Sequence, residues 1–354
     1  MKTTAILFSC LCLVCLRDSL LAKTDLSYTT VNPAVTIPGE TELEQNVQEI
    51  VNKNGPFISN SFAMGNLTGY PVGESHIGAF PHMQFGLFAG MGGTNMAYFD
   101  KGSKASSDGT MPGITPNVAL QFGIGLTEKT DLLGKFFLLS DSILDPGLST
   151  DMVTLQKYTI LSVGGKFRYQ IFGKQTILPF LFNFGGLTFS VGGDVMYGRF
   201  ELTGDYDADY GNISIDWGAG ATDVPLNFSS QYDGTILWGI FALSTQIVAY
   251  FEVFGIFQPY TGFGLAANYG YSRIKFNADG DLTTDAAGYP PAYAGKVADM
   301  TFLSKNAYTP YYVIPTYIVG LELNLWLMKI TAETMANLYN LSDINAQLGV
   351  RFQF

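Results

Sequence analysis

The last ten residues of the chain, Asn345 to Phe354, constrain the fold more than any other stretch. Apolar and polar side chains alternate there with a period of two. The apolar set is Ala346, Leu348, Val350, Phe352 and Phe354, and the polar set is Asn345, Gln347, Gly349, Arg351 and Gln353. Successive side chains of a strand point to opposite faces, so the pattern predicts a strand whose two faces meet different solvents.

The same alternation recurs along the chain from His82 onward. It is seen or inferred in ten runs, at 82–96, 117–126, 131–140, 155–172, 176–205, 235–257, 259–279, 317–325, 329–337 and 345–354. Long polar loops are expected at 97–115, 141–153, 206–234 and 280–308, and short turns at 127–130, 173–175, 258 and 327–328. An even strand count with loops long on one side and short on the other is typical of a transmembrane antiparallel β-barrel.

We therefore predict an all-β fold, a barrel of ten to fourteen strands in the bacterial outer membrane. The upper limit allows for 176–205, which is about three times the ten residues or so that span a bilayer. Charged residues make up only 14% of the chain, aromatic residues another 14%, and 40 residues are glycine, as a lipid-facing barrel requires. The uncharged run Gly234 to Phe251 also has the length of a transmembrane helix, but its β-branched and aromatic content favours a strand.

Residues 1–22 are predicted to be a signal peptide. Lys2 precedes an apolar stretch from Ala5 to Leu16, and Ala22 is a plausible cleavage point. Lipid attachment at Cys15 is the alternative. All three cysteines lie in this segment, so cleavage would leave no disulfide and no thiolate metal site.

Residues 23–81 are predicted to be an N-terminal plug, and 82–354 the barrel. A short amphipathic helix is expected at 42–53, capped by Thr41 and ended by Asn54-Gly55-Pro56. So short a helix is not stable alone, and the barrel mouth or lumen is the nearest place for it to dock. The stretch 56–81 is too long for a free loop in a compact domain.

The chain offers few residues for catalysis, and we expect no enzyme, cofactor or metal. It holds two histidines, His76 and His82, and no common metalloprotease, serine-hydrolase or nucleotide-binding motif. His82 is expected to face inward at a strand start. The net charge of −11 makes a nucleic-acid partner improbable.

Candidate lumen residues come from the inward positions of the predicted strands. In 235–257 the inward set is apolar and aromatic toward the outside, which suggests a path for a hydrophobic ligand or a surface that packs on the plug. That set comprises Ile236, Trp238, Ile240, Gln246, Tyr250 and Glu252. The polar lumen candidates are Lys166, Arg168, Glu322, Asn324 and Glu333, most of which are expected to form salt bridges with one another or with neighbouring charges.

A signal peptide, a plug segment containing Asn32, Pro33 and Ala34, a partly apolar lumen and a terminal Phe together resemble the long-chain fatty-acid transporter (FadL-like) family of outer-membrane proteins. The resemblance implies an N-terminal hatch with an Asn-Pro-Ala motif, and uptake of hydrophobic ligands through a lumen pocket. The terminal strand also resembles the closing strand of bacterial outer-membrane β-barrels in general, which implies that Phe352 and Phe354 form an assembly signal.

The leading hypothesis is uptake of small hydrophobic molecules such as long-chain fatty acids. The alternatives are a surface-exposed barrel whose outer loops bind a host or surface protein, and a general diffusion porin. The expected partners are outer-membrane lipid, a hydrophobic small molecule and the outer-membrane assembly machinery.

Overall fold

The computed structural model describes residues 23–30, 40–70, 77–97, 110–141, 154–179, 181–216, 221–284 and 295–354. One helix, α2 (Glu40–Asn66), and one antiparallel sheet make up this part of the chain. The strands are β1 (Lys23–Thr30), β2 (Met83–Ala97), β3 (Thr110–Thr127), β4 (Thr130–Ser140), β5 (Thr154–Phe172), β6 (Gln175–Leu178), β7 (Phe182–Asp216), β8 (Ala221–Val253), β9 (Phe257–Thr284), β10 (Gly295–Tyr308), β11 (Val313–Leu325), β12 (Met328–Asn337) and β13 (Ile344–Gln353).

Ten of the described strands pair into a closed ring. The order is β2, β3, β4, β5, β7, β8, β9, β11, β12 and β13, and β13 pairs with β2 to complete the circle. This confirms the predicted barrel and the strand count read from the period-two pattern. The long run at 176–205 includes one additional short strand, β6, which pairs with the start of β7 and lies outside the ring.

Large apolar side chains cover the outside of the ring. Phe85 on β2, Phe263 on β9 and Leu348 on β13 are 55%, 63% and 64% exposed, and similar side chains stand on the other strands. Aromatic residues border this band, with Tyr312 and Tyr339 at one end and Trp326 and Phe354 at the other. Such an exterior requires lipid, and only closed barrels satisfy strand hydrogen bonds there, so the protein is an outer-membrane β-barrel.

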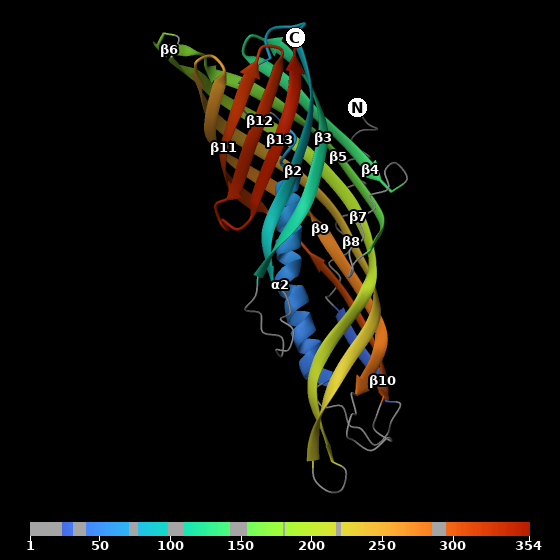
Figure 1. The fold of residues 1–354 in the computed structure, drawn as a ribbon. Helices are drawn as coiled ribbons and strands as arrows, with labels where there is room; N and C mark the ends of the chain where they lie inside the picture. Colours follow the sequence, from blue (N-terminus) through green and yellow to red (C-terminus); the bar gives the residue numbers. More distant parts are fainter. Residues whose placement is uncertain are drawn as a thin grey trace.

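The barrel continues on one side into a sheet that stands beyond the membrane, called here the extension (Figure 1). Its strand order is β7, β8, β9, β10 and β1, because β9 pairs with β11 over 257–267 and with β10 over 272–284. The turns at the opposite end are short, as periplasmic turns are, so the extension is extracellular. The predicted loops 206–234 and 280–308 are therefore largely strands. Polar side chains made these strands look like loops, since no lipid imposes an apolar face there.

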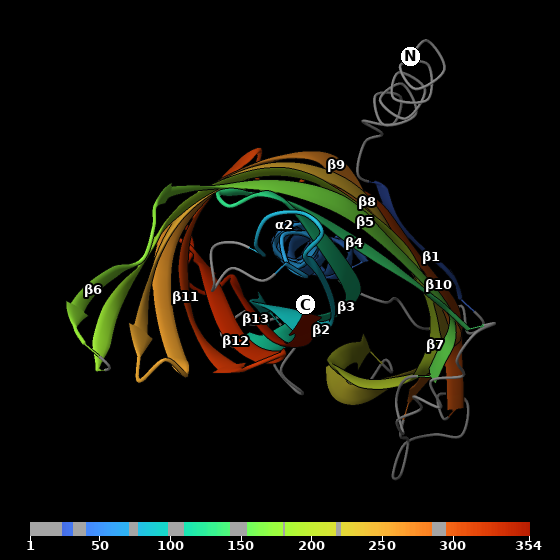
Figure 2. The ribbon, with the colours of Figure 1, turned by 90° about the horizontal axis from the view of Figure 1, so that it is seen from above.

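α2 lies inside the ring and runs outward along the extension (Figures 1 and 2). The predicted end at Asn54-Gly55-Pro56 is wrong, because the helix continues to Asn66 with Pro56 inside it. An internal proline costs a helix about 3 kcal/mol. Burial of every residue from Ser59 to Tyr70 in the lumen outweighs that cost. Gly55 is needed where it stands, because a Cβ there would lie 2.0 Å from the ring of Tyr308.

The N-terminal part of the predicted plug lies elsewhere. Lys23–Thr30 forms β1 on the outer edge of the extension, paired with β10, and is not in the lumen. Asn32, Pro33 and Ala34, the predicted signal peptide with Cys15, and His76 lie outside the described residues. Among the described residues, no helix combines the length and hydrophobicity needed to span a bilayer, and Gly234 to Phe251 belongs to β8.

The chain end closes the barrel. Phe354 donates its backbone N–H to the Met83 carbonyl at 3.0 Å, and Met83 donates to the Phe354 carbonyl at 2.8 Å. Deleting Phe354 removes this pair from the seam between the last and first strands. We expect a lower outer-membrane level of the heat-modifiable barrel, measured by gel migration of unheated and boiled samples. Deleting Leu341, which is exposed in an outer turn, is the control; equal levels of the two variants would contradict the prediction.

Candidate functional site

The outer half of the lumen is filled by apolar contacts between α2 and β8. The ring of Phe62 stacks on the indole of Trp238, with centroids 3.9 Å apart and planes 7° from parallel. Trp238 is fully buried, and Ile240 and Met64 join the same core. Gly198 on β7 makes room for the indole, since a Cβ there would lie 1.9 Å from Trp238 Cζ2. The plug is therefore packed against the wall at this level.

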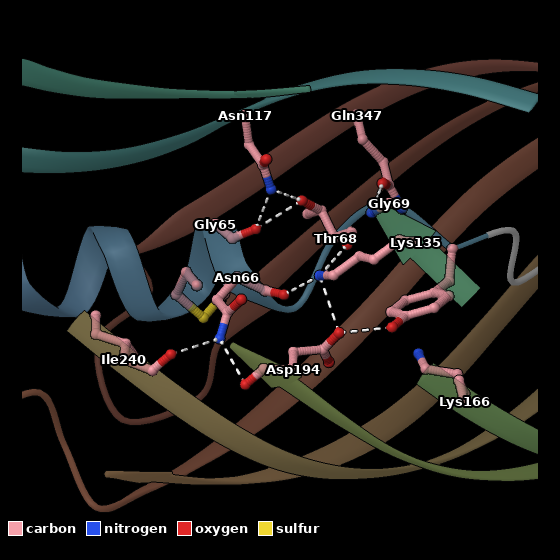
Figure 3. A network of polar contacts seen from close by, with 12 residues as sticks. Gly65, Asn66, Thr68, Gly69, Asn117, Lys135, Lys166, Asp194, Ile240 and Gln347 are labelled. Atoms are coloured by element: carbon pink, nitrogen blue, oxygen red, sulfur yellow. Dashed lines mark hydrogen bonds and ion pairs between the residues drawn. The ribbon is translucent and has the colours of Figure 1, made fainter. Parts of the chain in front are cut away.

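Below this core, wall side chains bind the last carbonyls of the helix. A helix ends with carbonyls that have no partner in the helix and with a partial negative charge. Asn345 on β13 donates to the Met64 carbonyl at 2.7 Å, and Asn117 on β3 donates to the Gly65 carbonyl at 2.5 Å. Lys135 on β4 donates to the Asn66 carbonyl, as Figure 3 shows. Side chains of three strands from one stretch of the wall, β13, β3 and β4, thus cap the helix end.

Lys135 contacts both the chain after the helix and a buried carboxylate of the wall (Figure 3). Its ammonium donates to the Thr68 carbonyl at 2.7 Å and lies 3.0 Å from Asp194 Oδ1, with both side chains fully buried. Tyr70 donates its hydroxyl to the same carboxylate oxygen at 2.6 Å. Gly164, the register partner of both charged residues, allows this approach, because a Cβ there would lie 1.9 Å from Asp194 Oδ1.

A further buried ion pair and a glutamine side chain hold the segment that follows the helix. Asp131 pairs with Arg168 at 2.5 Å and accepts the Ile77 N–H at 3.0 Å. Gly69 donates to Gln347 at 2.9 Å, and the Gln347 amide donates to Glu333 at 2.6 Å. Another buried ion pair, Glu322 with Arg351 at 2.9 Å, lies in the wall itself. We call the wall residues that bind the chain between Met64 and Ile77 the plug seat: Asn117, Asp131, Lys135, Asp194, Asn345 and Gln347.

The structure places the predicted lumen residues as follows. Trp238, Ile240, Gln246 and Tyr250 are buried inside the barrel, and Ile236 and Glu252 are half-buried. Lys166, Arg168, Glu322 and Glu333 are buried, and Asn324 is half-buried near the periplasmic rim. These residues are thus buried or half-buried, and the role of the first set as a ligand path stays a prediction. Glu252 pairs with Lys174 at 2.6 Å.

The prediction missed Lys135, Asp194, Asn117 and Tyr70 as a group. Leu133 and Lys135 are two residues apart in the predicted strand 131–140, so they lie on the same, inward face. A lysine on the inward face of a barrel strand could have been recognised as a candidate lumen residue. His82 was expected to face inward but is exposed, next to β2 rather than in it. Among the residues that the structure describes, no three His, Cys, Asp or Glu side chains are grouped to hold a metal ion.

Comparisons with known proteins add the following. The transport unit of the autotransporter AIDA-I from Escherichia coli is 10% identical, with a TM-score of 0.33, over 85% of this chain and 99% of that one. The P. putida toluene transporter TodX is 12% identical, with a TM-score of 0.24, over 84% and 93%. A Pseudomonas aeruginosa FadL homologue is 7% identical, with a TM-score of 0.18, over 77% and 88%. At these scores no functional argument follows from the likeness.

No curated protein matches the chain. The family model for Lsa36-like proteins, in contrast, matches residues 40–354, from the first residue of α2 to the end of the barrel. The chain belongs to the Lsa36-like family.

Proposed function

We propose that this protein is a sealed outer-membrane barrel that presents its extracellular sheet to a macromolecular partner. The observation that carries the proposal is the plug seat. Wall side chains from β3, β4, β7 and β13 bind the helix end and the residues after it, so the lumen is occupied by the chain itself. A general diffusion porin needs a water-filled lumen, and this arrangement does not favour it.

The outward face of the extension suggests the chemistry of the partner. Asp205, Asp233 and Asp279 are exposed there, and Asn277 donates to Asp279 at 3.1 Å. Asp281 and Asp299 share Lys296, at 2.9 Å and 2.5 Å. The inward face is different, because Ala278, Leu282 and Met300 are buried. An acidic face on a packed sheet favours a partner with a basic surface, and attraction between the two would speed their encounter.

The test uses the full chain in nanodiscs and a poly-lysine peptide as the basic probe. We expect binding that weakens with added salt and falls several-fold in the double variant Asp205→Asn/Asp279→Asn. The control is Glu128→Gln/Asp141→Asn, which removes two exposed carboxylates outside the extension. Equal binding by both double variants would overturn the acidic face as the recognition surface.

Uptake of a hydrophobic ligand such as a long-chain fatty acid is the second candidate. The apolar contact between Phe62 and Trp238 favours it, because a small shift of α2 at this level would expose an apolar wall. On this reading the intact chain binds a fatty acid, and Trp238→Asp weakens that binding by placing a charge on the wall. If the intact chain binds no fatty acid, the second candidate is rejected and presentation of the extracellular sheet to a partner remains as the proposed function.

A further inference from the structure

Basic side chains gather at one level on the outward face of the sheet. Arg199 on β7 and Arg273 on β9 lie in one cross-strand row, on either side of Leu237. The next row outward holds Lys157, Lys275 and Lys305 on β5, β9 and β10, all exposed. We call these five residues the basic band. Rows on one face lie two residues apart, about 7 Å along a strand, so the band is narrow.

The band lies where the exterior changes from apolar to polar. Along β9 the outward positions run from Phe263 and Leu265 to Tyr269, then to the basic pair at 273 and 275, and then to Asp279. The row directly below the band holds Tyr197 and Tyr271 on either side of Gly239. Tyrosine is enriched where acyl chains meet headgroups. The basic band therefore stands at the headgroup level of the outer leaflet.

Two of the five charges lie in an unfavourable arrangement. Lys275 and Lys305 are direct cross-strand partners, and like charges in that position destabilise a sheet. Lys157 and Arg199 both approach Glu201, at 3.8 Å and 2.5 Å. The band is also local, since the sequence holds no Lys or Arg between Arg199 and Arg273, and the face beyond it is acidic.

We propose that the basic band binds the phosphorylated headgroups of outer-leaflet lipid. Lysine ammonium groups and an arginine fork are the side chains that bind phosphate oxygens, and the apolar belt below would hold the acyl chains of the same molecule. The inference depends on the position of the barrel in the membrane. It does not depend on what the extension binds or on whether the lumen carries a ligand.

The experiment measures lipid binding to the full chain in neutral detergent by native mass spectrometry, with lipid A carrying two phosphates as the probe. We expect Lys275→Gln/Lys305→Gln to weaken binding roughly tenfold or more. Lys275→Arg/Lys305→Arg should retain it. The control is Lys129→Gln/Lys174→Gln, which removes two exposed lysines at the periplasmic end. Each variant is first checked for heat-modifiable migration, so that loss of the fold is recognised.

Three results would overturn the proposal. One is equal lipid binding by the two glutamine variants. Another is binding of the dephosphorylated lipid as tight as that of the phosphorylated lipid by the unaltered chain. That result would assign all the affinity to the apolar exterior of the ring. The last is displacement of the lipid by millimolar inorganic phosphate, which would make the band a site for free anions.

Discussion

Removing residues 40–70 should convert a non-conducting protein into an open pore. The deletion takes out α2 and the segment bound in the plug seat, and it leaves the ten barrel strands untouched. The vacated lumen would be lined by side chains such as Lys135, Asp194 and Gln347, which attract water and ions. Discrete current steps in planar bilayers would report the opening.

Deleting 23–30 is the matched control for this experiment. It removes β1 from the edge of the extension and leaves the plug in place, so we expect no current. Conductance by the intact protein that is unchanged after removal of 40–70 would show that α2 does not seal the lumen, and would favour the porin hypothesis.

Replacing Lys135 with methionine should lower the free energy of unfolding by about 3–5 kcal/mol. The change leaves the Asp194 carboxylate buried without its cation, and it removes a donor from the carbonyls of Asn66 and Thr68. Breaking a buried ion pair by removing one partner typically costs that much. Urea unfolding of the protein in lipid vesicles would measure the difference.

Lys157→Met supplies the matched comparison, because it breaks an ion pair in which the Lys157 side chain is 68% exposed. Exposed pairs contribute at most about 1 kcal/mol. Adding Asp194→Asn to the Lys135 variant should cost less than the sum of the two single changes, since the two groups interact directly. Similar losses in Lys135→Met and Lys157→Met would argue against the plug seat as a major source of stability.

The barrel could be predicted from the sequence because lipid imposes a rule on every strand that crosses it. The outer face of such a strand must be apolar and the lumen face is mostly polar. Burial therefore alternates along β13, and along β5 from Tyr158 to Gln170. The extension escaped prediction because β10 lies beyond the acyl chains of the membrane, so no apolar face is imposed on it. The end of α2 was misplaced because Asn54-Gly55-Pro56 is a local stop signal, whereas the burial of Phe62 and Met64 is set by distant strands.

The plug seat shows a second limit of prediction. Lys135 and Asp194 are far apart in the sequence, and their strands, β4 and β7, do not pair with each other. Their contact depends on the register of β4 with β5 and of β5 with β7, which places both next to Gly164. No local pattern contains that information. The alternation of apolar and polar residues predicts on which face of the strand a side chain lies. It does not predict which other side chain it contacts.

The position of α2 also limits how the lumen could ever open. Before α2 in the sequence, β1 is hydrogen bonded to the extension; after it, β2 begins at the periplasmic rim beside Phe354. The polypeptide is thus threaded through its own cylinder and fastened at both ends. The helix cannot be ejected whole toward either compartment. Any passage through the barrel would therefore need a shift or a local unwinding of α2 while it stays inside the ring.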